Sequence, residues 1–129
     1  LGTAGCMGRS RLHGGSFTTD ALPAGCDAIS LVRVVHDHDD AVVMQLLNKV
    51  RTALPASGRL LLAEPMAETP GAEPMGGAYF GFYLFAMGSG RPRSAAELTG
   101  MLHQAGFSRV REVPTALPLL TRMLVAERS

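Results

Sequence analysis

The amino-acid sequence predicts an α/β fold, with a mostly parallel sheet that ends in an antiparallel hairpin. Two observations predict it. A strand, a helix and a second strand follow one another between residues 27 and 64, and two further strand-like segments follow a second helix near the end of the chain. A strand–helix–strand unit of this length joins parallel, neighbouring strands. The sequence contains no internal repeat and no low-complexity linker, so we expect one continuous piece of structure.

The strand–helix–strand unit has clear local signals. Asp27–Val35 is an almost unbroken apolar run rich in β-branched residues, which is typical of a strand covered on both faces. A helix is predicted from Asp39, because apolar residues recur at three- and four-residue spacing as far as Leu54, and Pro55 then ends it. Arg59–Glu64 is a second short apolar run and is predicted as the next buried strand.

Further elements are predicted on either side of this unit. Arg9–His13 is a candidate third strand of the same sheet, although its alternation of apolar and polar residues is only fair. Ser94–Glu97 has the pattern of a capping box and opens a helix that Gly106 closes. Phe107–Val113 and Leu119–Ala126 are predicted as two strands that pair as the terminal hairpin.

Composition excludes several classes of protein. The chain has 129 residues, a formal net charge of +1, 47% hydrophobic and 18% charged residues, which excludes a disordered segment and disfavours a nucleic-acid partner. Cys6 and Cys26 are too few for a disulfide scaffold, and no apolar run reaches the roughly 18 residues of a membrane span. We therefore expect a cytoplasmic protein. Because the first residue is Leu1, we also expect the chain to be part of a longer one.

Two titratable residues follow neighbouring predicted strands. His36 comes directly after the first strand of the unit and Glu64 ends the next, so both are expected at the edge of the sheet where ligands bind in parallel α/β folds. The glycines and serine of Gly14–Ser16 are expected at that edge too. A histidine is a suitable general base, and a nearby carboxylate can orient its ring. The alternative is that His36 and Asp37 only cap the following helix, with Glu64 solvated.

The run from His36 to Asp40 also permits a metal interpretation. Two imidazoles two residues apart, with carboxylates between and after them, can bind zinc or iron. The run is similar to the HxHxDH motif of metallo-β-lactamase-like hydrolases, but Ala41 stands where the last histidine of that motif would be. A metal-dependent hydrolase that uses His36 and His38 therefore remains an alternative.

Aromatic residues are concentrated between Ala78 and Met87. Five of the seven aromatic residues of the chain lie there, which are Tyr79, Phe80, Phe82, Tyr83 and Phe85. They are expected either to fill the core over the sheet or to form the wall of an apolar substrate pocket, and both roles are possible on different faces. Arg33 is a lone charge in an apolar strand, so it needs an acidic partner or a position at the edge of the sheet.

Four segments carry a resemblance to a known family. They are HGGSF at 13–17, SLVRVVHDHDD at 30–40, GRLLLAEPM at 58–66 and AYFGFYLFAMGSGRPRSAAEL at 78–98. Together they resemble bacterial O-methyltransferases that depend on S-adenosylmethionine (SAM). The likeness is greatest to the carotenoid branch of this family, whose members act on hydroxyneurosporene and demethylspheroidene. The resemblance covers nearly the whole chain.

The resemblance implies roles for the residues at the predicted edge of the sheet. His36 matches the general base that takes the hydroxyl proton during methyl transfer, and Glu64 matches the acid that orients it. Asp37 is a third candidate for this catalytic group. A second flanking carboxylate of the family would fall at Pro92 and is absent, while His38 replaces a tryptophan of the family motif.

The resemblance also implies SAM as the cofactor and a small apolar acceptor that carries a hydroxyl group, with no metal. The family's GGD motif is GGS here, so a serine takes the place of the acid on the adenine side of the cofactor. The residues that we assign to the cofactor are Gly15, Ser16, Phe17 and Arg33. The residues that we assign to the acceptor are Tyr79, Phe80, Tyr83 and Met87.

The resemblance finally implies that the chain is the C-terminal half of a Rossmann-like class I methyltransferase domain. The family's glycine-rich cofactor loop and its helical dimerisation domain would then lie upstream of Leu1, and the full-length protein would be a homodimer. The predicted function is methylation of a hydroxyl group on an apolar acceptor such as a carotenoid, with the isolated fragment inactive. A non-catalytic remnant is a further alternative, beside the metal-dependent hydrolase.

Overall fold

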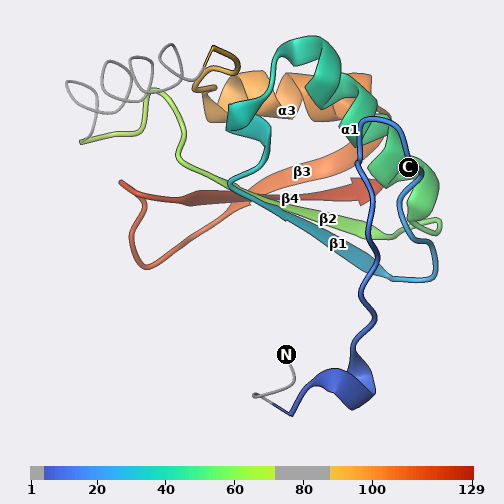
Figure 1. The fold of residues 1–129 in the computed structure, drawn as a ribbon. Coiled ribbons are helices and arrows are strands. Elements are labelled where there is room, and N and C mark those ends of the chain that lie inside the picture. The colour runs from blue at the N-terminus through green and yellow to red at the C-terminus, as the bar shows by residue number, and fades with distance from the viewer. Residues whose placement is uncertain (1–4, 72–87) are drawn as a thin grey trace.

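The computed structural model describes residues 5–71 and 88–129, and within them one sheet is covered by two α-helices. Figure 1 shows that both α-helices lie over the same face of the sheet. The strands are β1 (Ala28–Val32), β2 (Arg59–Glu64), β3 (Phe107–Val113) and β4 (Arg122–Arg128), and the helices are α1 (Asp40–Ala53) and α3 (Ala95–Gln104), with 3-10 turns η1 (Met7–Arg9) and η2 (Val35–Asp37). No helix in the described ranges has the length and apolar character needed to cross a membrane.

The strand order is β1-β2-β4-β3. β1 pairs with β2 in parallel, and β4 lies antiparallel between β2 and β3. β1, β2 and β3 therefore run in one direction and β4 runs in the other, so the sheet is mixed, and the predicted α/β class and terminal antiparallel hairpin are confirmed. The sequence did not predict that β4 enters the sheet between β2 and β3, because the choice of neighbouring strand depends on contacts distant in the chain.

The predicted strand at Arg9–His13 is wrong. Arg9 belongs to the turn η1, the residues that follow have no regular structure, and Leu12 is 73% exposed. A strand needs a neighbour for its backbone N–H and C=O groups, and this segment pairs with no strand in the part of the chain that the structure describes. Its partial alternation of residues was therefore no evidence of a buried face.

Two other strands, β1 and β4, differ from the prediction at both ends. β1 ends at Val32 rather than Val35, because Arg33 has a positive φ of 54° and turns the chain out of the strand into η2. The last strand begins at Arg122, three residues later than predicted, after an irregular connection. β2 and β3 have the predicted bounds, and α1 begins one residue after Asp39.

The core lies between the helices and the sheet. Its largest contributions are apolar side chains at helical spacing on α1 and α3 and at alternate positions on the strands, including Leu46, Leu47, Val50, Leu60, Leu62, Leu98, Leu102 and Leu124. Each such leucine contributes roughly 1.5–3 kcal/mol by leaving water. Along β2 the buried positions alternate, so Glu64 continues the row of Leu60 and Leu62 and points toward the helices.

The start of α3 provides a test of the helix capping. The Ser94 side chain accepts a hydrogen bond from the Glu97 backbone N–H at 3.1 Å, and the Glu97 carboxylate accepts one from the Ser94 N–H at 2.9 Å. Ser94→Ala removes the first bond, so we expect it to lower the free energy of unfolding by about 0.5–2 kcal/mol. Urea unfolding measures this loss. The control is Ser108→Ala, whose hydroxyl makes only a 3.5 Å contact; an equal loss in both variants would contradict the capping role.

Candidate active site

A buried carboxylate lies where β1 and β2 end. Glu64 is the last residue of β2 and is 2% exposed. Its Oε1 accepts hydrogen bonds from the backbone N–H groups of Val34 at 3.0 Å and Val35 at 2.8 Å. These bonds hold the turn that follows β1 against the end of β2. The alternative in which Glu64 is a solvated strand-end residue is therefore wrong.

The turn η2 carries His36 into contact with this carboxylate. His36 is 6% exposed, and its Nδ1 lies 2.6 Å from Glu64 Oε2. Its Nε2 lies 3.2 Å from Asp37 Oδ1. The three predicted catalytic residues are thus brought together. With Nδ1–H donating to Glu64, the other ring nitrogen carries the lone pair and can accept a proton, and the two carboxylates stabilise the imidazolium that forms.

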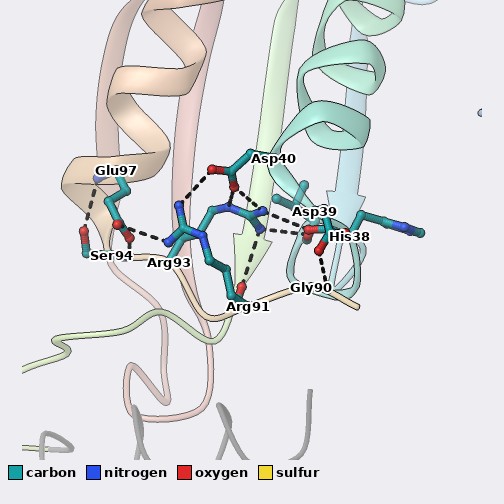
Figure 2. Close-up of polar contacts among 9 residues, drawn as sticks. His38, Asp39, Asp40, Gly90, Arg91, Arg93, Ser94 and Glu97 are labelled. Atoms are coloured by element: carbon teal, nitrogen blue, oxygen red, sulfur yellow. Dashed lines mark hydrogen bonds and ion pairs between the residues drawn. The ribbon is translucent and has the colours of Figure 1, made fainter. Parts of the chain in front are cut away.

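An arginine lies on the other side of the same turn. Arg93 is 2% exposed, and its guanidinium donates to the backbone carbonyl oxygens of Val35 and His38 at 3.0 and 2.8 Å. It also donates to Asp40 Oδ1 from Nε at 3.0 Å and from a terminal nitrogen at 2.6 Å (Figure 2). The sequence did not indicate a role for this residue. Its only signal was a pair of arginines beside the capping box, and nothing in the pattern shows which of the two is buried.

Asp40, the first residue of α1, accepts hydrogen bonds from both arginines. Arg91 donates to Asp40 Oδ2 and to Glu97 Oε1, each at 3.1 Å. The hydrogen bonds from Arg93 and Arg91 hold the pKa of the Asp40 carboxyl below its ordinary value of 3.8. The pKa of Glu97 is also lowered, first by the hydrogen bond from the Ser94 backbone and then by Arg91. The helices α1 and α3 are therefore joined by an ionic cluster beside the His36 turn.

The loop that we assigned to the cofactor lies against α1. Lys49 on α1 donates to the backbone carbonyl oxygens of Phe17 and Asp20. The Phe17 ring meets the His38 ring edge-on, with 5.0 Å between their centroids. Gly15 has a φ of +144°, and a Cβ there would lie 2.6 Å from Asp20 Oδ2, so glycine is required at this position. The loop thus approaches the turn of His36 through His38.

Ser16 and the fourth cofactor candidate are placed differently. The Ser16 hydroxyl lies 2.7 Å from the Thr18 hydroxyl, and its backbone N–H donates to Asp20 Oδ2 at 2.9 Å. Both groups of Ser16 therefore have partners within the loop. Arg33 is exposed just beyond the end of β1, so it takes the position at the edge of the sheet that its lone charge required. The four acceptor candidates, Tyr79, Phe80, Tyr83 and Met87, lie outside the described residues.

The metal interpretation finds little support in the geometry. Within residues 5–71 and 88–129, no three side chains of histidine, cysteine, aspartate or glutamate come together in a way that could hold a metal ion. His36 is turned to Glu64, while the ring of His38 packs on Phe17. The two imidazoles of the HDH run therefore serve different contacts.

A mixed sheet whose parallel strands end beside a buried histidine–carboxylate pair, with helices over one face, is the architecture of part of a Rossmann-like α/β domain. The particular family follows from comparison with known proteins. The family model of the O-methyltransferase domain matches residues 3–108, and the chain belongs to this family.

Two curated relatives and a solved structure illustrate the similarity. The chain is 46% identical over 128 residues to demethylspheroidene O-methyltransferase of Cereibacter sphaeroides, covering 99% of this chain and 34% of the relative. It is 47% identical over 114 residues to the Rhodobacter capsulatus enzyme of the same name, covering 88% of this chain and 29% of the relative. The structure of human N-acetylserotonin methyltransferase in complex with SAM shares the fold, with 22% identity, a TM-score of 0.80, and coverage of 91% of this chain and 33% of that one. The chain thus spans about a third of the length of these proteins.

The ionic cluster at Asp40 predicts a pH dependence of stability. Because the folded-state pKa of Asp40 is lowered, its ion pairs stabilise the fold above the ordinary value of 3.8, and this stability is lost as the pH falls through the folded-state pKa. We expect the free energy of unfolding to decrease below about pH 4, and to decrease less steeply in Asp40→Asn. Urea unfolding between pH 7 and pH 2.5 measures both slopes. Asp27→Asn, at the opposite end of β1, is the control; equal slopes in Asp40→Asn and the unaltered protein would contradict the prediction.

Proposed function

We propose that the protein containing this chain is a SAM-dependent O-methyltransferase in which His36 is the general base. The observation that carries the proposal is the buried contact of 2.6 Å between His36 Nδ1 and Glu64 Oε2 at the ends of two parallel strands. Membership of the O-methyltransferase domain family and the resemblance of the HDHDD and AEP segments support it. No observation favours a metal-dependent hydrolase over this function.

In the proposed reaction, SAM supplies an electrophilic methyl group on a sulfonium. His36 Nε2 takes the proton of the acceptor hydroxyl as the new oxygen–carbon bond forms and the sulfur–carbon bond breaks, so a neutral thioether and an imidazolium remain. Glu64 accepts the Nδ1–H throughout and stabilises the charged ring. A positioned base of this kind contributes about 10²–10⁴-fold to the rate, and alignment of the oxygen with the methyl group supplies much of the remainder.

Asp37 occupies the approach to the reactive nitrogen. Its Oδ1 lies 3.2 Å from His36 Nε2, where an acceptor hydroxyl would have to hydrogen-bond. The Asp37 side chain is 39% exposed, so it can rotate toward solvent when the acceptor binds. Because a carboxylate oxygen repels the lone pair of an unprotonated nitrogen, we infer that Asp37 turns away from Nε2 of the neutral ring and leaves this place to the hydroxyl. It then remains near enough to stabilise the imidazolium.

The loop of Gly15–Phe17 fits part of a cofactor site. It lines an open pocket of about 410 Å³ together with Asp20, and the left-handed Gly15 leaves its backbone accessible at close range. The neutral hydroxyl of Ser16 cannot replace the acid of the family motif. Asp20 is the acidic residue among those that line this pocket, and its Oδ2 accepts a hydrogen bond from the Ser16 N–H. We propose that this loop and Arg33 contribute to SAM binding without providing the whole site.

We propose that the acceptor is an apolar molecule with a hydroxyl group, and a carotenoid in particular. The names of the two bacterial relatives and the aromatic residues of segment 78–87 support this proposal. Tyr79, Phe80, Tyr83 and Met87 are the side chains proposed to contact the acceptor.

We also propose that this chain forms the base-bearing part of a longer catalytic domain. It spans about a third of each curated relative, and β1 has an unpaired edge within the described sheet. The remaining length of the full-length protein would provide the glycine-rich cofactor loop and a dimerisation domain.

The first test replaces the base. His36→Asn keeps an amide that can donate to Glu64 but removes the basic nitrogen, so we expect kcat of the full-length protein to fall about 10²–10⁴-fold. The dissociation constant of SAM is expected to stay unchanged. Steady-state assays with a hydroxylated carotenoid measure kcat, and calorimetry measures SAM binding. The control is His103→Asn on the exposed side of α3; full turnover in His36→Asn would overturn the proposed base.

The second test concerns the cofactor. The 129-residue chain is expected to bind SAM much more weakly than the full-length protein, because its loop lines only an open pocket and small-molecule sites enclose most of their ligand. Isothermal titration calorimetry on both proteins checks this expectation. Micromolar binding to the 129-residue chain would contradict the proposed division of the cofactor site.

A further inference from the structure

We propose that Arg93 is a positioning residue for the base, which holds His36 in place through the backbone of the turn η2. This inference rests on the proposed role of His36. Neither the HDHDD segment nor the acid that ends β2 includes Arg93, whose guanidinium donates to backbone carbonyl groups of the turn and to Asp40. These contacts connect it to the base through the backbone of the turn.

The guanidinium of Arg93 spans the turn that carries the base. One terminal nitrogen donates to the carbonyl oxygen of Val35, directly before His36, and the other donates to that of His38, two residues after it. The Arg93 side chain is 1% exposed, so water does not compete for these bonds. A planar group with donors in a fixed fork can hold two carbonyl groups at a set separation, which the single ammonium of lysine cannot do.

Asp40 makes this buried charge possible. An arginine without a counter-charge would be costly in this position, and Asp40 Oδ1 accepts hydrogen bonds from two of its nitrogens. Asp40 is the first residue of α1, so the same contacts fix the start of that helix relative to the turn. Arg93 also lines a narrow gap together with His36 and Glu64, which places it beside the catalytic pair.

The residues just before Arg93 close over the same turn. The Ser89 hydroxyl donates to the carbonyl oxygen of Asp37 at 3.0 Å, and the Gly90 N–H donates to Asp39 Oδ1 at 3.0 Å. A Cβ on Gly90 would lie 2.2 Å from the carbonyl oxygen of His36, so only glycine permits this approach. Figure 2 shows Gly90, Arg91 and Arg93 facing the segment from His38 to Asp40. Segment 89–93 therefore contacts four successive residues of the turn, from 35 to 38.

The two sides of the turn restrain different parts of His36. Glu64 restrains the ring through Nδ1 and the preceding N–H groups, whereas segment 89–93 restrains the carbonyl side of the backbone. Nε2 is held at one point in space only if both act together. Because a misplacement of about 1 Å can cost about 10²-fold in rate, losing the Arg93 contacts should lower kcat without changing the chemistry of the ring.

The test is a double-mutant cycle in the full-length protein, with Arg93→Met, His36→Asn and the double variant. We expect Arg93→Met to lower kcat about 10–10²-fold when His36 is present. In the His36→Asn background we expect a further loss of less than about 2-fold, because no base remains to be positioned. An equal loss in both backgrounds would show a merely structural role and would overturn the proposal. Full turnover of His36→Asn alone would instead overturn the proposed base.

Arg91→Met is the matched control. The Arg91 side chain is 44% exposed, and it donates to the other oxygen of Asp40 and to Glu97 rather than to a carbonyl of the turn. We expect its kcat to remain within about 2-fold of the unaltered protein, since exposed ion pairs contribute little. A loss as large as that of Arg93→Met would show that any disturbance of the Asp40 cluster suffices, and would overturn the assignment to Arg93.

Two further variants keep the test decisive if Arg93→Met fails to fold, as judged by thermal unfolding. Arg93→Lys retains the charge but not the fork, and we expect it to fold and still to lower kcat in the presence of His36 only. Gly90→Ala pushes on the His36 carbonyl from the same side and is expected to show the same dependence on His36. Unchanged kcat in both variants would contradict the proposed positioning.

Discussion

The carboxylate of Glu64 is almost without access to solvent, and this constraint organises the end of the sheet. A buried carboxylate is tolerated only when donors surround it, and here three are supplied by the turn after β1. Two are backbone N–H groups and the third is the ring of His36. The strand β1 must therefore stop at Val32, turn and present its following residues to β2. The placement of the histidine is a consequence of satisfying this one charge.

Arg93, which carries the opposite charge, binds the carbonyl groups on the other side of the turn. Glu64 accepts hydrogen bonds from backbone N–H groups of the turn, and Arg93 donates hydrogen bonds to its carbonyl groups. Both the N–H and the C=O groups of this short segment are therefore hydrogen-bonded. Glu64 belongs to β2, while Arg93 directly precedes the cap of α3. The candidate active site is thus held by elements that are nearly thirty residues apart in the chain. Substitutions of Gly90 or Arg93 are therefore expected to affect the position of His36, although neither residue is a predicted catalytic residue.

Local patterns predicted much of the fold because the forces that form those elements are local. The alternation of Leu60, Leu62 and Glu64 marks a strand with one buried face, and the capping box at Ser94 marks the start of α3. The contact of His36 with Glu64 was also predictable, because adjacent parallel strands end at one edge of a sheet. The prediction of a strand at Arg9–His13 was wrong for the converse reason. Whether a weakly alternating segment becomes a strand depends on a partner elsewhere, and no local feature reveals it.

The sequence by itself determined the α/β class, the helices and their caps, the existence of β1 and β2 on either side of α1, and the meeting of the histidine with the carboxylate. These features follow from hydrophobic periodicity, helix capping and strand direction, which depend on residues that are close together in the sequence. Only the tertiary structure decided that β4 enters between β2 and β3 and that Arg93 is buried while Arg91, two residues earlier, is 44% exposed. The two arginines are alike in sequence, and the difference arises because the carbonyl groups of a distant turn need donors that only one of them can reach.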